Sequence, residues 1–242
     1  MAFILKFQFK ALAYALFLWL TLSSTASATE IAAAPSKEWT SASLRNTLNH
    51  LPTGDAKRGQ LVHEKMFCSS CHGPIGVAPT QNWPHLAGQK AAYVAKLMLD
   101  YQDKRMTSNK GAELMHDIAV MMTPQQISDV AEFYAQQKAA LDDGTPRPAT
   151  DLNVTQLVRK GDPKRLITPC ASCHGTRGQG GKLEAPALAG QNPLYFVRSM
   201  LDYQNGHRTN DVAKGMRTFA KNLTRTEIEA LATYYADLPK KR

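Results

Sequence analysis

Two stretches of the chain decide its fold, Cys68-Ser69-Ser70-Cys71-His72 and Cys170-Ala171-Ser172-Cys173-His174. Each stretch holds two thiols one helical turn apart, and a histidine follows the second thiol directly. This is the attachment pattern of a c-type haem, because such thiols reach the two vinyl groups of one porphyrin and the histidine then lies beneath the iron. The motifs predict two covalent haem c groups, with attachment through Cys68, Cys71, Cys170 and Cys173 and proximal iron ligands His72 and His174.

Zinc is the alternative occupant of these motifs, since paired cysteines at this spacing also bind zinc. The histidine after each second cysteine favours haem instead. All four cysteines of the chain lie in the two motifs, so none remains for a disulfide framework.

The two motifs belong to a tandem duplication. Residues 68–102 align with residues 170–204 at a constant offset, and about half of the aligned positions are identical. Each copy consists of a short helix, the attachment motif, a loop, a Pro-x-Leu-Ala-Gly-Gln segment, a helix ending in Met-Leu-Asp-Tyr-Gln, a polar loop and a final helix. Each final helix starts with a capping box, at residues 123–126 and 224–227. No alternating strand pattern is present, so we predict an all-α fold of two tandem domains.

The N-terminus has the pattern of a secretory signal peptide. Lys6 and Lys10 precede an apolar run at residues 11–22, and the small residues Ala26-Ser27-Ala28 follow it. The run is too short to span a bilayer comfortably, and no second run of spanning length follows. We therefore expect a cleaved signal and export to the periplasm; the alternative is an uncleaved signal that acts as an anchor.

The remaining boundaries follow from the repeat and from composition. Residues 142–152 are rich in Asp, Gly and Pro and are typical of a linker. The expected organisation is a signal peptide at 1–28, a loose lead-in at 29–52, a first domain at 53–141, a linker at 142–152 and a second domain at 153–242.

The charge of the mature chain is moderately basic and spread along the sequence. Without Lys6 and Lys10 it has 27 basic and 20 acidic side chains, a net charge of +7, and no run of five like charges. This pattern does not indicate a nucleic-acid partner. It is more typical of docking to an acidic redox protein or to a membrane surface, although the four propionates of two haems would cancel much of the excess.

The sequence resembles the class I cytochromes c, and in particular the di-haem cytochromes of the cytochrome c4 family. The resemblance covers both domains, about 190 residues, and rests on the attachment motifs, residues 84–89 and 186–191, residues 206–211 and the final helices. It implies two class I cytochrome c domains whose haems lie next to each other. It also implies that the carbonyls of Pro84 and Pro186 accept a hydrogen bond from the ring of the haem-ligating histidine. Without the resemblance, each proline is an ordinary turn residue.

The identity of the second axial ligand of each iron decides the function of the haem, because a methionine there stabilises reduced iron and closes the site. Among nine methionines, two pairs align between the repeats. Met98 and Met200 lie within an amphipathic helix, where methionine usually fills core. Met115 and Met216 align after a one-residue slip, on the segment before the final helix where the resembled family places its ligand. We expect that segment to be irregular and predict Met115 and Met216 as sixth ligands, with core packing as the alternative.

Other polar side chains have weaker assignments. The histidines outside the motifs have no histidine counterpart in the other repeat, so we expect surface or packing roles for His63, His85, His116 and His207. Arginine pairs well with carboxylates, and tyrosines and arginines cluster after the long helix of each repeat. The candidates for contacts to haem propionates or to the domain interface are Tyr101, Arg105, Tyr203 and Arg208.

Irons with both axial positions filled leave no place for a small-molecule substrate, so the sequence predicts an electron carrier with redox-protein partners. The expected donor is a quinol-oxidising complex or a dehydrogenase, and the expected acceptor is a terminal oxidase or reductase. One alternative is a haem enzyme of the peroxidase or thiosulfate dehydrogenase type, which needs an open or unusual axial site. Another is a cytochrome subunit of a larger dehydrogenase or oxidase complex.

Overall fold

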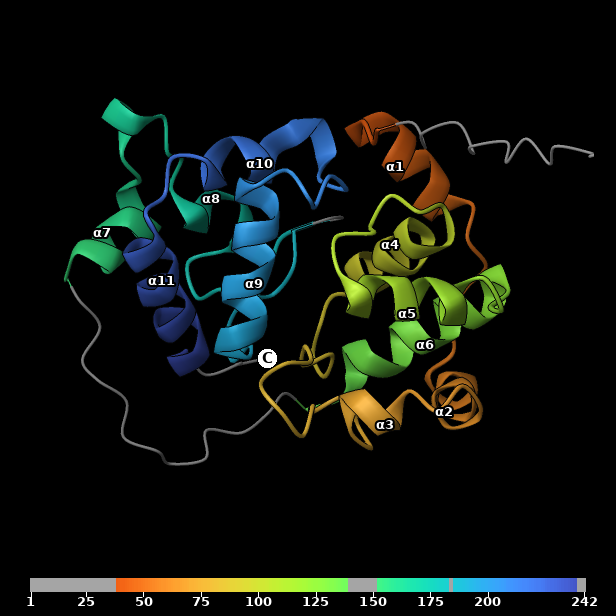
Figure 1. Ribbon diagram of the computed structural model, residues 1–242. Helices are drawn as coiled ribbons and strands as arrows, with labels where there is room; N and C mark the ends of the chain where they lie inside the picture. The colour runs from red at the N-terminus through yellow and green to blue at the C-terminus, as the bar shows by residue number, and fades with distance from the viewer. Residues whose placement is uncertain (1–37, 139–151, 183–184, 239–242) are drawn as a thin grey trace, which may run out of the picture. The chain divides into compact units, whose positions relative to one another are not determined.

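The computed structural model describes residues 38–138, 152–182 and 185–238, all within one unit of the chain, Pro35–Arg242. The predicted signal peptide and most of the predicted linker lie outside these ranges. Within them the chain is helical, and its only β-type pairing is an isolated bridge between Asp162 and Ile167 (Figure 1). The all-α prediction is therefore confirmed. No helix in the described part of the chain is long and apolar enough to cross a membrane.

The first repeat and the segment before it form helices in the order α1 (Ser41–Asn49), α2 (Ala56–Lys65), α3 (Ser69–His72), α4 (Ala91–Gln102), α5 (Lys110–Ala119) and α6 (Pro124–Gln136). The second repeat follows as α7 (Leu152–Lys160), the 3-10 helix η1 (Pro163–Arg165), α8 (Cys170–His174), α9 (Pro193–Gln204), the 3-10 helix η2 (Val212–Lys214), α10 (Gly215–Ala220) and α11 (Arg225–Asp237).

Both predicted capping boxes are confirmed. At the start of α6, the backbone N–H of Gln126 donates to Thr123 Oγ1 and the N–H of Thr123 donates to the Gln126 side chain, at 3.3 and 2.8 Å. Thr224 and Glu227 repeat the arrangement at the start of α11, at 3.2 and 2.8 Å. These bonds satisfy N–H groups that have no partner within the helix, so they fix where each final helix begins.

The lead-in is not loose where it is described, contrary to the expectation. Residues 41–49 form helix α1, because Thr40 and Ser43 cap its first turn reciprocally, at 3.0 Å in both directions. Leu44 is fully buried, and Leu48 and Leu51 pack against the core of the first repeat. Besides the cap, burial of Leu44 and packing of Leu48 hold this nine-residue helix in place, and Leu51 anchors the chain just after it.

The segment of Met115 is a regular helix, which corrects a second expectation, whereas the segment of Met216 is irregular in part. Met115 lies in the middle of α5, whose first turn is capped by Asn109 through a bond from the N–H of Ala112. Met216 lies in the first turn of the short helix α10, which begins at Gly215, directly after Ala213 and Lys214 with φ angles of 50° and 58°. Asn109 is an effective N-cap, so a local signal for the start of α5 was present in the sequence.

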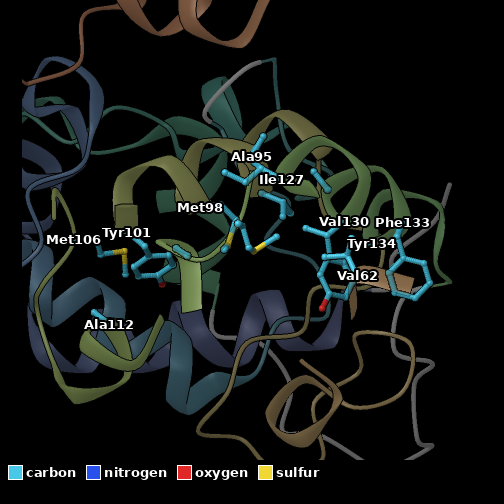
Figure 2. Close-up of a cluster of buried hydrophobic side chains, with 14 residues drawn as sticks. Val62, Ala95, Met98, Tyr101, Met106, Ala112, Ile127, Val130, Phe133 and Tyr134 are labelled. Atoms are coloured by element: carbon cyan, nitrogen blue, oxygen red, sulfur yellow. The ribbon is translucent and has the colours of Figure 1, made fainter. Parts of the chain in front are cut away.

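The core of the first repeat is formed mainly by α2, α4 and α6. Figure 2 shows its side chains, among them Val62 from α2, Met98 from α4 and Ile127 from α6. Helices α2 and α6 approach so closely that a Cβ on Gly59 would lie 2.0 Å from the carbonyl oxygen of Asp129. Only glycine fits there, because a packed interior leaves no room for an added methyl group.

The second repeat has a corresponding core. Its fully or almost fully buried members come from α7, α9 and α11 and include Val158, Met200, Ile228, Leu231 and Tyr235.

The two repeats contact each other through matching glutamines. Gln89 accepts from the backbone N–H of Ala187 and donates to the Ala187 carbonyl, at 2.8 and 3.0 Å. Gln191 makes the same two bonds with the backbone of His85, at 2.8 and 3.0 Å. Gln89 aligns with Gln191 and His85 with Ala187, so the two contacts are related as in a two-fold symmetric interface.

Candidate haem sites

Each attachment motif lies on a short helix that a glycine ends. Cys68 precedes α3 and Cys71 lies within it, while Cys170 and Cys173 both lie in α8, so each cysteine pair is one helical turn apart and faces the same side. All four thiols are free. Gly73 and Gly175 end the helices with φ angles of 72° and 79°, a conformation that glycine adopts without strain.

The two histidines of the motifs are buried and held by the prolines that the resemblance indicated. His72 Nδ1 lies 3.2 Å from the Pro84 carbonyl oxygen, and His174 Nδ1 lies 3.0 Å from that of Pro186. A carbonyl can only accept, so Nδ1 must carry the proton, and Nε2 is then a lone-pair donor suited to a metal. Burial lowers the pKa of both histidines, with the proline carbonyls acting in the opposite direction.

One cavity of about 380 Å³ is lined by residues of both motifs and both repeats. Its walls are mainly apolar and include Leu86, Val94, Leu188 and Phe196. An apolar wall with a few converging polar groups is the usual setting of a cofactor. Thiols at attachment spacing, an imidazole with Nε2 free to coordinate and an apolar wall are present in each repeat, so the residues fit two haem c groups.

The cavity wall also holds both methionine pairs singled out by the alignment. Met115 and Met216 are half-buried and line it from α5 and α10. Met98 and Met200 also reach it but are buried in the helical cores of α4 and α9. The lining by itself therefore does not distinguish the pairs; burial among core side chains favours a packing role for Met98 and Met200.

Three of the four propionate candidates line the cavity, namely Tyr101, Tyr203 and Arg208. Arg208 is 2% exposed, and its side-chain partners are neutral: Asn210 Oδ1 at 3.0 Å, Tyr93 Oη at 3.1 Å and the ring of Tyr203. A buried guanidinium that meets no carboxylate among the described residues is suited to an anionic ligand group. Burial raises the pKa of Tyr93 to about 12, so its hydroxyl stays protonated.

Arg105, the fourth candidate, is placed differently. It pairs with Asp103, and its guanidinium lies over the ring of Trp39 at 4.1 Å from the centroid. It is not among the residues that line the cavity. The structure therefore brings Arg105 to the segment before the first repeat rather than to the haem site.

The remaining histidines occupy packing or surface positions. His63 is buried with Nδ1 2.8 Å from Tyr134 Oη, and burial lowers its pKa. His85 accepts from the N–H of Ala78 through Nδ1 at 3.0 Å, and His116 Nδ1 lies 2.7 Å from the Tyr101 carbonyl. His207 is exposed.

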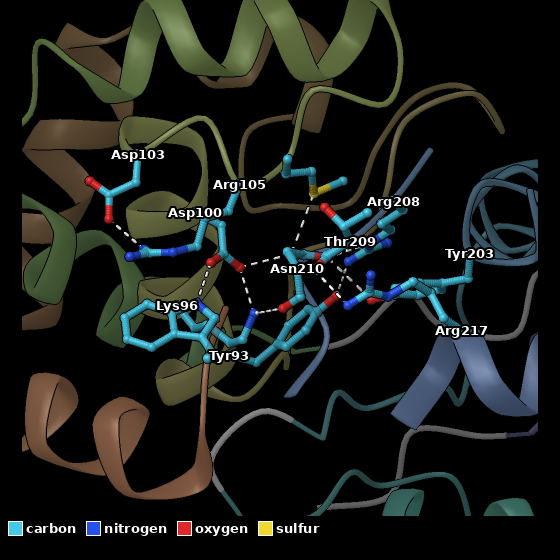
Figure 3. Close-up of polar contacts among 12 residues, drawn as sticks. Tyr93, Lys96, Asp100, Asp103, Arg105, Tyr203, Arg208, Thr209, Asn210 and Arg217 are labelled. Carbon is cyan, nitrogen blue, oxygen red and sulfur yellow. Dashed lines mark hydrogen bonds and ion pairs between the residues drawn. The ribbon is translucent and has the colours of Figure 1, made fainter. Parts of the chain in front are cut away.

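A buried polar network that the sequence did not predict lies beside the cavity (Figure 3). Asp100 Oδ2 accepts from Lys96 Nζ at 2.5 Å and from Asn210 Nδ2 at 2.7 Å, while Asp100 Oδ1 accepts from Trp39 Nε1 at 2.5 Å. Asp100 is fully buried, and Lys96 and Asn210 are each 2% exposed. The available signal was an i, i+4 Lys–Asp pair on an otherwise apolar helix, where a charged pair must find partners.

Comparisons with known proteins agree with this geometry. Residues 56–138 match the family model described as cytochrome c, and residues 166–234 match that of cytochrome c oxidase, cbb3-type, subunit III. Cytochrome c4 of Stutzerimonas stutzeri is 33% identical over 76% of this chain and 90% of its own length. The crystal structure of reduced recombinant cytochrome c4 from Pseudomonas stutzeri superposes with a TM-score of 0.68 at 31% identity, over 77% of this chain and all of that chain.

A third relative is similar to a lower degree. The thiosulfate dehydrogenase electron acceptor of Stutzerimonas stutzeri strain A1501 is 29% identical over 73% of this chain and 81% of its own length. The cytochrome c4 matches cover both repeats at more than 30% identity, and each repeat carries a fitting haem site. The chain therefore belongs to the cytochrome c4 family of di-haem c-type electron-transfer cytochromes.

Proposed function

We propose that this cytochrome carries single electrons in the periplasm and that each repeat supplies a complete ligand set for one haem. His72 and Met115 would hold one iron, and His174 and Met216 the other, with the cysteines of each motif as covalent anchors. The observation that supports this best is the duplicated site: in each repeat a buried histidine presents Nε2, and an aligned methionine lines the same cavity. A haem with two protein ligands supplies one-electron redox chemistry without a substrate site.

The protein groups around each haem would orient and tune it. The Pro84 and Pro186 carbonyls fix the imidazole rings and raise their basicity, as partners of a ligating histidine do. Arg208, with Tyr101 and Tyr203, would receive propionate groups, since Arg208 brings a buried positive charge to the cavity wall. The apolar lining keeps water away from the porphyrin faces.

Carbon monoxide tests the carrier proposal against a haem enzyme. We expect the reduced protein to show a c-type absorption spectrum that carbon monoxide leaves unchanged, because both irons have strong protein ligands. A change in half or all of the haem absorbance would show an open or labile axial position and would reject the simple carrier. The experiment needs only the intact exported protein and no partner.

The partners we propose are redox proteins with acidic docking surfaces. Residues 153–242 hold 15 lysines and arginines against seven aspartates and glutamates, whereas residues 53–141 hold nine against eight. Several exposed cations of the second repeat have no ion pair among the described residues, namely Arg159, Lys160, Lys164, Arg177, Lys182 and Lys221. The name of the thiosulfate dehydrogenase electron acceptor supports a dehydrogenase as donor class. A terminal oxidase or reductase would be the acceptor.

Electron transfer with an anionic reagent should reveal this charge asymmetry. We expect oxidation of the protein by ferricyanide to slow as salt is added. The triple variant Lys160→Glu/Lys164→Glu/Lys221→Glu should lower the rate at low salt by about tenfold or more, since electrostatic steering raises association rates 10- to 1000-fold. The matched control changes the same charge in the first repeat, with Lys57→Glu, Lys65→Glu and Lys90→Glu, and should have a clearly smaller effect. Equal effects of the two triples would contradict docking through the second repeat.

A further inference from the structure

The segment Glu38–Leu51, which we name the strap, lies before Ala56, the first residue that the cytochrome c family model matches. It contains α1 and contacts both repeats. On the first repeat, Trp39 Nε1 donates to Asp100 Oδ1 at 2.5 Å, and Leu44 is fully buried. These contacts attach the strap to helix α4 and to the core beneath it.

The same end of the strap also reaches the second repeat. Glu38 forms an ion pair with Arg217 at 3.1 Å, and its other oxygen lies 3.9 Å from Lys214 Nζ. The backbone N–H of Ala213 donates to the Trp39 carbonyl at 3.3 Å. Two adjacent residues, Glu38 and Trp39, therefore hold one repeat by an indole N–H and the other by a carboxylate and a carbonyl.

Asp100 connects these contacts into one network. Its Oδ1 accepts a hydrogen bond from Trp39. Its Oδ2 accepts from Lys96 and from Asn210, which belongs to the second repeat. Lys96 also donates to the Asn210 carbonyl at 2.6 Å. Because a buried carboxylate requires several donors, each donor that is lost weakens the bridge that the others make.

We propose that the strap holds the two haem-binding repeats in one fixed mutual arrangement and that Trp39 is its positioning residue. The strap acts beside the matching glutamine contacts, which lie between the repeats themselves. The proposal concerns the contact between the repeats and does not depend on which methionines ligate the irons. A fixed arrangement keeps the distance between the two haem sites constant, and the rate of electron exchange between two centres depends on that distance.

Hydrogen exchange of the Trp39→Phe variant tests the proposal on the holoprotein. Phenylalanine keeps an aromatic ring beneath Arg105 but lacks the N–H that binds Asp100, and it is smaller than the indole. The amides of His85 and Ala187 report contact between the repeats, because each donates to a glutamine of the other repeat. We expect both amides to exchange roughly 5- to 150-fold faster than in the unmodified protein, the range for a lost buried hydrogen bond.

Amides within each repeat serve as internal references. Ile127 and Ile228 are fully buried and donate to the cap residues of α6 and α11; their exchange should not change. If all amides of the first repeat accelerated equally, Trp39 would only stabilise that repeat, and the proposal would be wrong. Unchanged exchange of His85 and Ala187 would also overturn it.

A second pair of variants separates the strap from local packing around Trp39. Glu38→Gln removes an ion pair to the second repeat, whereas Glu229→Gln removes the pair with Arg225 within α11, and the two glutamates are 50% and 52% exposed. We expect Glu38→Gln to accelerate exchange at His85 and Ala187, less than Trp39→Phe does, and Glu229→Gln to leave both amides unchanged. Identical results for the two glutamate variants would contradict a role of Glu38 in the strap.

Discussion

Replacing Met216 with alanine should open one of the two haem irons to carbon monoxide while the other keeps its spectrum. With the proposed ligand set, loss of the thioether would leave the iron of the second repeat with one protein ligand, and reduced five-coordinate haem binds carbon monoxide. The potential of that haem should fall by at least ~0.1 V, a small part of the ~0.8 V that axial ligands span, because methionine stabilises reduced iron. Met115→Ala should do the same to the other haem. Absorption spectra with carbon monoxide and redox titration measure both effects.

The aligned core methionines provide the matched controls. Met98→Leu and Met200→Leu remove a sulfur from the same cavity wall but conserve volume in a helical core, so their cost should stay below about 1.5 kcal/mol. Neither should bind carbon monoxide or show a lowered potential. If Met200→Leu opened the iron and Met216→Ala did not, the assignment of the sixth ligand in the second repeat would be reversed.

The parts of the structure that the sequence predicted well depend on local chemistry. The attachment motifs require thiols one turn apart, and the final helices begin where Thr123 and Thr224 can cap them. Both patterns are set by a few neighbouring residues, so that they are visible in the chain itself. The duplication strengthened both predictions, because the same sequence signal occurs in each repeat.

The parts that the sequence did not predict depend on contacts between distant residues. Helix α1 has few intrinsic helix signals and is held by burial of Leu44. Gln89 and Gln191 were part of a motif shared by both repeats, but their bonds to Ala187 and His85 exist only because the repeats face each other. Tertiary contacts of this kind override local propensity and cannot be derived from spacing.

The duplicated halves also differ at the network that joins them. Arg208 aligns with Met106, so the first repeat has no counterpart of this buried guanidinium, although it does have a bridging amide, since Asn109 Nδ2 donates to Asp202 Oδ2 of the second repeat at 2.9 Å. Asn210 reaches across to Asp100 and also contacts Met106 Sδ at 3.7 Å. The two haem sites therefore have different electrostatic surroundings despite their common motif, and a buried cation such as Arg208 favours the reduced, less positive state of a nearby haem.

Replacing Lys96 with methionine should destabilise the protein strongly, by about 3 kcal/mol, because it leaves the Asp100 carboxylate buried without its ammonium partner. The side chains of Lys96 and Asp100 are 3% and 0% exposed. Trp39 and Asn210 still donate to Asp100, which places the expected loss at the lower end of the range for a broken buried pair. The control Arg225→Met breaks an i, i+4 pair that is more than half exposed and should cost at most about 1 kcal/mol. Denaturant unfolding of the holoprotein measures both.

The double variant Lys96→Met/Asp100→Asn decides whether the uncompensated charge is the cause. An amide in place of the carboxylate keeps an oxygen for the Trp39 N–H and carries no charge, so the double variant should be more stable than Lys96→Met alone. The free-energy effects of the two substitutions would then not add, which is typical of residues that share one buried network. If the double variant were as unstable as the sum of the two single changes, the loss would come from packing around the Lys96 side chain and not from the charge of Asp100.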